Sequence, residues 1–171
     1  MLQKAEWQVL NYLTLASEPI FVSQIARDIG LGKSSVSRSL KTLKSYGFIK
    51  HTQRGKSIFC EVDRNSQVFS KIRVALNLIE LEPKLAALKK IVNKIILFGS
   101  CSKGTDTHES DIDILVVTSD KVKAIEVTQN IKFDRKIQWV IKTPQEYIVF
   151  NNKEPIFAEE VGLGIVLWEN Q

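Results

Sequence analysis

Apolar and polar residues follow a helical rhythm through the first part of this chain. Apolar side chains recur every three or four residues, which predicts amphipathic helices at residues 6–15, 22–29 and 33–46. Ser23 is expected to cap the second helix and Gly30 to end it. Gly47 follows the third helix where a left-handed conformation is needed, so we expect that helix to stop there.

A hairpin and a long apolar helix are expected next. Residues 48–51 and 57–62 are predicted strands, and the polar segment 52–56 with its one glycine forms the turn. Residues 66–80 carry a wide apolar stripe, typical of a helix that packs on a neighbouring domain or on a second copy of itself. Glu82 and Pro83 are expected to break this helix, with Pro83 in the first turn of another that runs to residue 92.

The rhythm changes in the second half to short apolar runs separated by helical segments. Strands are predicted at 95–98, 112–117, 135–141 and 164–168, and helices at 121–130 and 155–161. Thr143, Pro144 and Glu146 have the order of an N-cap, a first-turn proline and a capping-box acid, so another helix begins there. Strands that alternate with helices indicate an α/β domain. We therefore expect an α+β chain with domains at 1–64 and 93–171 and a helical linker or dimerisation segment at 65–92.

Charge is distributed unevenly between the two halves. Residues 1–90 hold 15 Lys and Arg against 7 Asp and Glu, a net +8, whereas residues 91–171 hold 9 against 12, a net −3. The two values sum to the +5 of the whole chain. Such asymmetry indicates a first half that binds a polyanion, although a basic surface that is merely solvated would show the same balance.

Several classes of protein are excluded by what the sequence does not contain. No apolar run approaches the roughly 18 residues that span a bilayer, and the N-terminus does not resemble a signal peptide. Cys60 and Cys101 make neither a disulfide framework nor zinc-ligand spacing. We expect reduced thiols in a cytoplasmic protein.

The third predicted helix and the hairpin concentrate the positive charge. No acidic residue lies between Asp28 and Glu61, and this stretch contains seven cations: Lys33, Arg38, Lys41, Lys44, Lys50, Arg54 and Lys56. Ser34, Ser35, Ser37 and Ser39 add short hydroxyls suited to phosphate oxygens.

This order of helices and strands resembles the winged helix-turn-helix family of regulators, of the MarR-like kind, over about residues 4–63. The resemblance is closest in FVSQIARDIGLGKSSVSRSLKTLKSYGFIKHTQRGKSIFCEVD. It implies that the third helix enters the major groove of double-stranded DNA and that the wing lies along the backbone or the minor groove. The DNA-binding candidates are Lys33, Ser34, Ser35, Ser37, Arg38, Lys41, Arg54 and Lys56. Such modules usually act as homodimers, but some winged helices bind proteins instead.

A glycine- and acid-containing motif carries the candidate chemistry of the second half. The segment IILFGSCSKGTDTHESDIDILVV places an apolar strand before Gly99 and Ser100, with Gly104, Ser110, Asp111 and Asp113 downstream. The glycines permit close approach of a phosphate to the backbone. Asp111 and Asp113 lie two apart on a strand, point the same way, and can together hold Mg²⁺ on a triphosphate.

The motif resembles the minimal members of the DNA polymerase β-like nucleotidyltransferase superfamily over about residues 85–170. That resemblance implies nucleotide-binding roles for Gly99, Ser100, Lys103, Gly104 and Ser110, and metal-binding and catalytic roles for Asp111 and Asp113. An exposed Lys103 without such a role is equally compatible with the sequence.

The family needs a third carboxylate from the neighbouring strand. Counting back from Thr143 and Pro144 places Gln138 at that position, and a neutral amide is a poor Mg²⁺ ligand and takes no proton at pH 7. Asp134 is expected before the strand begins, while Asp106 and Glu109 lie on the turn and are weak substitutes.

Three functional hypotheses remain. The favoured one is a DNA-binding transcription regulator whose second domain binds Mg-nucleotide with little or no catalysis. The alternative is an active enzyme that moves a nucleotidyl group from an NTP to a hydroxyl of a small molecule, nucleic acid or protein. The third is an interaction module that pairs with a small helical partner protein, as relatives do in toxin–antitoxin operons.

Overall fold

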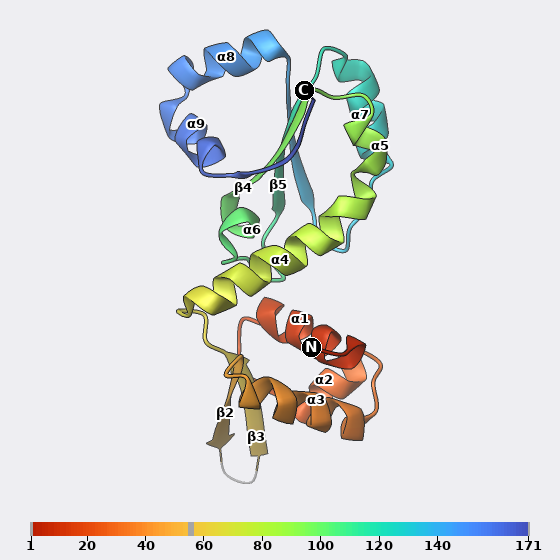
Figure 1. The fold of residues 1–171 in the computed structure, drawn as a ribbon, viewed down its shortest axis with the longest axis vertical. Coiled ribbons are helices and arrows are strands. Elements are labelled where there is room, and N and C mark those ends of the chain that lie inside the picture. The colour runs from red at the N-terminus through yellow and green to blue at the C-terminus, as the bar shows by residue number, and fades with distance from the viewer. Residues whose placement is uncertain (1, 55–56, 171) are drawn as a thin grey trace. The chain divides into compact units, whose positions relative to one another are not determined.

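The computed structural model describes residues 2–54 and 57–170 (Figure 1). The chain folds as two compact units, Met1–Arg73 and Val74–Gln171. Within the described residues, no helix has the length and the apolar character needed to cross a membrane.

The first unit contains three helices and a small antiparallel sheet. Its elements are α1 (Lys4–Leu15), β1 (Ile20–Phe21), α2 (Val22–Asp28), α3 (Lys33–Ser45), β2 (Ile49–Arg54) and β3 (Ser57–Val62). The strands are ordered β1-β3-β2. The sequence pattern predicts all of these elements except β1, which has only two residues and therefore shows no alternation.

The helix boundaries in this unit follow from backbone conformation. Gly30 and Gly47 have φ of +68° and +74°, so both end their helices in the left-handed region, as predicted. The prediction for Ser23 is wrong: Phe21 is the N-cap of α2, and Ser23 lies inside the helix. The helix begins at Val22, as predicted, and Phe21 before it lies opposite Phe59 in the register of β1 and β3.

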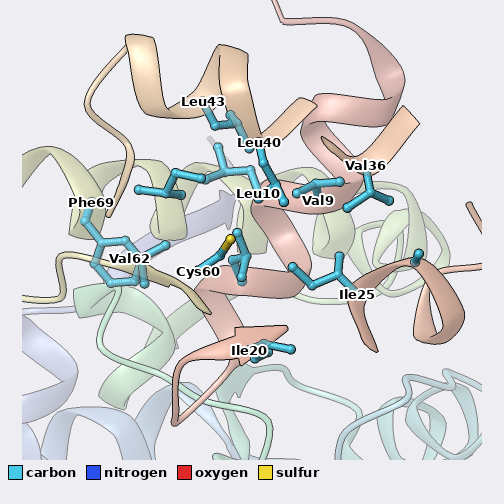
Figure 2. Close-up of a cluster of buried hydrophobic side chains, with 13 residues drawn as sticks. Val9, Leu10, Ile20, Ile25, Val36, Leu40, Leu43, Cys60, Val62 and Phe69 are labelled. Carbon is cyan, nitrogen blue, oxygen red and sulfur yellow. The ribbon is translucent and has the colours of Figure 1, made fainter. Parts of the chain in front are cut away.

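The apolar faces of α1, α2 and α3 meet the inner face of the sheet (Figure 2). Leu10 and Leu13 of α1 and Leu40 and Leu43 of α3 are almost completely buried. Cys60 of β3 is buried at the same centre and is a free thiol, as the sequence predicts. The predicted three-residue and four-residue spacing thus corresponds to one continuous core.

Helix α4 (Gln67–Lys84) is longer than predicted, and the division between the units falls within it. Pro83 does not break it but lies in its last turn. A proline there removes only one backbone N–H, and the helix end is held because Leu81 and Leu85 are buried and Leu85 N–H donates to the Leu81 carbonyl at 3.1 Å. A separate short helix, α5 (Ala86–Lys89), follows.

The second unit is built on a mixed four-stranded sheet. Its remaining elements are β4 (Lys94–Phe98), α6 (Gly99–Lys103), β5 (Ile112–Val117), α7 (Lys121–Gln129), β6 (Ile137–Lys142), α8 (Pro144–Lys153), α9 (Pro155–Gly162) and β7 (Ile165–Glu169). The strand order is β6-β5-β4-β7, with β5 and β6 parallel and the other pairs antiparallel. The mixed sheet confirms the predicted fold class.

Helices cover both faces of this sheet (Figure 1). Ile95 and Leu97 of β4 pack towards α5 and α7, whereas Ile96 and Phe98 pack towards α8 and α9. Both central strands are therefore buried on two sides, which explains their continuous apolar runs.

Helix α8 begins as its sequence predicts. Thr143 N–H donates to the Glu146 carboxylate at 2.7 Å, and Glu146 N–H donates to Thr143 Oγ1 at 3.1 Å. These reciprocal bonds form a capping box that satisfies two N–H groups at the helix start.

A buried polar network anchors the loop between α6 and β5. Asp106 is fully buried, and its carboxylate accepts from Arg135 Nη1 at 2.8 Å and from Asn77 Nδ2 at 3.0 Å. Arg135 also donates to the Asn77 side-chain oxygen at 3.3 Å. Each charge is thus opposed, which burial requires. Arg135 precedes β6 rather than belonging to it, contrary to the predicted strand 135–141.

Replacing Asp106 with Ala should leave the Arg135 guanidinium buried without its carboxylate. We expect this to lower the free energy of unfolding by about 3–5 kcal/mol, as measured by denaturant titration. Glu169→Gln is the matched control, because Glu169 pairs with Lys94 at 2.9 Å but its side chain is 56% exposed. That variant should unfold nearly as the parent does. Equal losses in both variants would contradict a special role for the buried pair.

Candidate functional site

Helix α3 has one buried face and one basic face. Val36, Leu40 and Leu43 are buried in the core of the first unit. The opposite face is exposed and carries four cations and two of the predicted serines: Lys33, Ser34, Ser37, Arg38, Lys41 and Lys44. These positions recur at helical spacing, so they form a continuous polar strip that can approach a polyanion.

Two of the four serines are less exposed than the residues of this strip. Ser35 is only partly exposed, and Ser39 is 4% exposed among the core residues of the unit. The expectation that Ser39 offers a hydroxyl to a phosphate is therefore wrong, because its position falls on the buried face beside Val36 and Leu40.

Among the described residues of the hairpin, one cation is already paired. Lys50 of β2 pairs at 2.6 Å with Asp63, the residue that follows β3, so its charge is already opposed. Arg54 is the last residue of β2 and lies opposite Ser57 in the register. Lys56 lies outside the described residues. The candidate nucleic-acid interface in the described chain is thus centred on α3.

In the second unit, the turn after β4 is built against Asp113. Phe98 lies opposite Asp113 in the antiparallel register, and Gly99 follows with φ of +66°. A Cβ at position 99 would overlap the Asp113 carboxylate, so both the conformation and the space require glycine. Gly104, with φ of +71°, ends α6. Gly99 therefore brings the backbone of the turn next to the acid, and Gly104 ends the short helix that follows.

Four polar side chains at the start of β5 and β6 share one face of the sheet, two of them within the strands and two from the residues just before them. Asp113 lies opposite Gln138 in the parallel register, and Ile112 N–H donates to the Lys136 carbonyl, which continues the pairing one step further. Residues two apart on a strand point to the same side, so Asp111 and Asp113 lie beside Lys136 and Gln138. Lys136 Nζ is 2.9 Å from Asp111 Oδ2. On the side of β6, the two acids therefore face one cation, Lys136, and one amide, Gln138.

Burial and neighbouring negative charges both raise the pKa of Asp113. Burial, then the charges of Asp111 and Glu160, raise the pKa of Asp113 above its ordinary value, with Lys136 opposing them. The Asp111 carboxylate in turn raises the pKa of Lys136, so that amine stays protonated. Asp113 is therefore a partly buried acid whose negative neighbours outweigh the one cation beside it.

Two residues of this site were not identified from sequence. Lys136 could have been found, since it precedes Gln138 by two residues and therefore shares its face. Glu160 gave no signal, because it comes from α9 and reaches the site only through the tertiary fold. It pairs with Lys103 at 3.6 Å, so the lysine predicted to meet phosphate is opposed by a carboxylate.

The other candidate acids do not complete a three-carboxylate site. Asp106 is held in the buried network, while Glu109 and Asp134 are exposed outside the strands. Among residues 2–54 and 57–170, no three His, Cys, Asp or Glu side chains are grouped so as to hold a metal ion. At the position where the family resemblance expects a third carboxylate, the residue opposite Asp113 in the register is Gln138.

Ser110 organises the turn that precedes the two acids. Its hydroxyl accepts from Thr107 N–H at 2.9 Å and lies 3.4 Å from Thr107 Oγ1. Cys101 is buried beside this turn, where its thiol donates to the Asp111 carbonyl at 3.5 Å. These contacts fix the approach of the chain to Asp111.

Removing the charge of Asp113 should stabilise the protein. A carboxyl whose pKa is raised in the folded state favours unfolding at neutral pH, and this penalty fades as the pH falls through the raised pKa towards the ordinary 3.8. Asp113→Asn should therefore raise the free energy of unfolding at pH 7 and have little effect near pH 3, as measured by denaturant titration at both values.

Asp134→Asn serves as the control, because it removes the same charge from an exposed position outside the site. A gain of equal size in both variants would mean that net charge, rather than the site, causes the effect.

Comparison with known proteins supports both halves of this description. The family model "Polymerase beta, Nucleotidyltransferase" matches residues 81–171, more than half of the chain. The "IclR helix-turn-helix domain" model matches residues 7–53. Both predicted resemblances are therefore confirmed, with an IclR-type rather than a MarR-like helix-turn-helix.

The chain is also similar to a solved structure of a regulator. It is the crystal structure of an IclR transcriptional regulator from Alicyclobacillus acidocaldarius, with 15% identity and a TM-score of 0.34. The match covers 57% of this chain and 42% of that one, so we draw nothing further from it. No curated protein matches this chain.

Proposed function

The chain belongs to the polymerase beta nucleotidyltransferase family, and on this premise we propose that it is a DNA-binding transcription regulator whose second unit binds Mg-nucleotide with little or no nucleotidyl transfer. The helix-turn-helix in the first unit is consistent with a regulator. The observation that carries the proposal is the pairing of Asp113 with Gln138, where transfer would require an acid.

The basic strip of α3 supports DNA binding. Lys33, Arg38, Lys41 and Lys44 are exposed on the face away from the core, at the positions from which a recognition helix contacts DNA. Ser34 and Ser37 are short enough to let the backbone of α3 approach base edges, with Arg38 as the principal candidate for base contact. Lys41 is better placed for phosphate, because it lies one turn further from the helix start.

Removing Arg38 and Lys41 together should weaken binding to a DNA duplex by more than about tenfold at low salt. If about six cations of the parent contact phosphates, its affinity should fall as about the fifth or sixth power of salt concentration, and the double alanine variant should reduce that exponent by about two. Fluorescence anisotropy of a labelled duplex at several salt concentrations measures both.

The double variant Lys123→Ala with Lys132→Ala is the control, since it removes two exposed cations from the second unit. No binding of the parent at low salt would overturn the DNA-binding proposal, and equal losses in both double variants would overturn the role of α3.

We propose a homodimer, because helix-turn-helix dimers contact two half-sites related by a two-fold axis. In the first unit, Val68 of α4 is available for such an interface, because its side chain is apolar and 58% exposed.

The geometry around Gly99 supports nucleotide binding. Asp111 and Asp113 would hold one Mg²⁺, which neutralises the charge of a triphosphate when bound. Gly99 and Ser100 would place backbone and hydroxyl donors beside the phosphates, since Gly99 has no side chain between the turn and Asp113. Gln138 takes no proton at neutral pH, so it would not activate an attacking hydroxyl.

The double variant Asp111→Ala with Asp113→Ala should lose Mg²⁺-dependent NTP binding in calorimetry. The control Glu109→Ala with Asp134→Ala, which removes two exposed acids outside the strands, should retain it. Unchanged binding in the first variant would mean that nucleotide binds elsewhere.

A transfer assay with labelled NTP tests catalysis. Transfer from labelled NTP should be absent or very slow in the parent, and Gln138→Asp should raise it. Robust turnover by the parent would favour the alternative, an active nucleotidyltransferase.

A further inference from the structure

The β5–β6 register groups Asp111, Asp113, Lys136 and Gln138 on one face of the sheet. The pairs across the two strands are Asp113 with Gln138, by register, and Asp111 with Lys136, by an ion pair of 2.9 Å. The second pair lies where β5 and β6 begin, beside the turn that Gly99 opens. A ligand held by the two acids would therefore meet both β6 side chains.

This arrangement is unfavourable for two divalent cations. In two-metal sites the ions lie about 3.5–4 Å apart, and carboxylates must offset their mutual repulsion. Here β6 contributes no carboxylate: Gln138 is neutral, and the Lys136 ammonium already neutralises one of the two acids. A second ion on the β6 side would face Lys136 at short range.

The same side chains are well suited to one cation and a phosphate. The Lys136 side chain is 75% exposed, so it can leave Asp111 at small cost when a metal ion takes that carboxylate. An ammonium released in this way can donate to phosphate oxygens. Lys103, the other lysine close to the turn, lies 3.6 Å from Glu160 and is already opposed by a carboxylate.

We infer that this site takes a single divalent cation with its nucleotide, and that Lys136 supplies the positive charge on the β6 side. The inference rests on the proposed function, since it describes how the second unit binds nucleotide. Lys136 is then a specificity-determining residue, which favours nucleotide binding and disfavours the second metal ion needed for transfer.

Counting bound Mn²⁺ tests this inference without relying on activity. Equilibrium dialysis and electron paramagnetic resonance would be applied to the full chain with saturating Mn²⁺ and α,β-methylene-ATP or α,β-methylene-GTP in turn. The double variant Asp111→Asn with Asp113→Asn reports Mn²⁺ bound elsewhere. The parent should hold one Mn²⁺ per chain at the site, with no magnetic coupling between ions.

Two variants assign the effect to residues. Lys136→Gln with Gln138→Asp should bind two Mn²⁺ ions that are close enough to couple magnetically. Lys136→Gln alone should weaken analogue binding by about tenfold, as expected for loss of a charged donor to phosphate. Lys132→Gln, which removes an exposed lysine of the same segment, should leave analogue binding unchanged.

The outcomes separate this inference from the proposed function. Two Mn²⁺ ions in the parent, or only one in the variant Lys136→Gln with Gln138→Asp, would overturn the inference while nucleotide binding stands. Equal analogue affinity in the parent and in Lys136→Gln would overturn the role of Lys136. If neither analogue nor Mn²⁺ binds, the nucleotide half of the proposed function fails and the inference fails with it.

Discussion

The register of β5 is the constraint on which the second unit depends. Ile114 and Val116 are buried against α5 and α7, and Leu115 and Val117 against α8 and α9. A shift by one residue would exchange these two sets, so packing fixes the strand relative to both neighbours. The same register directs Asp111 and Asp113 to one side at the open end of the strand, beside the Gly99 turn. The polar site is therefore a consequence of how the apolar part of the strand packs.

Asp106 and Asp113 are the same type of residue but have different surroundings. Asp106 is fully buried, but Arg135 and Asn77 compensate its charge, so it holds the loop in place. Asp113 is only partly buried, and its closest acidic neighbours raise its pKa rather than lowering it. Compensated charge is structural, whereas uncompensated charge has its natural partner in a ligand. The network at Asp106 thus supports the loop that leads to Asp111 and Asp113.

Membership of the nucleotidyltransferase family determines the fold more firmly than the chemistry. The glycine turn and two acids would be unchanged whether the protein transfers nucleotides or only binds them. The distinction depends on the neighbouring strand, where Gln138 and Lys136 replace the expected negative charge with a neutral amide and a cation. Function is therefore argued from these side chains and not from the fold that carries them.

Much of this protein could be predicted from its sequence, because local patterns reflect local physics. Helical spacing located α1, α2 and α3, and Gly47 marked the end of α3 because only glycine readily takes its conformation. Continuous apolar runs located β4 and β5, and counting back from Thr143 placed Gln138 at the position that pairs with Asp113.

Tertiary structure decided what depends on residues far apart in the chain. Packing around Leu81 and Leu85 carries α4 through Pro83, and pairing with β3 creates β1 from two residues. The partners of Asp106 come from α4 and from the segment before β6, while Glu160 reaches the acids from α9. A sequence pattern reports the conformation that a segment prefers. It does not report which distant charge lies beside that segment, and here the distant charges decide that Asp106 is paired in a buried network while the pKa of Asp113 is raised.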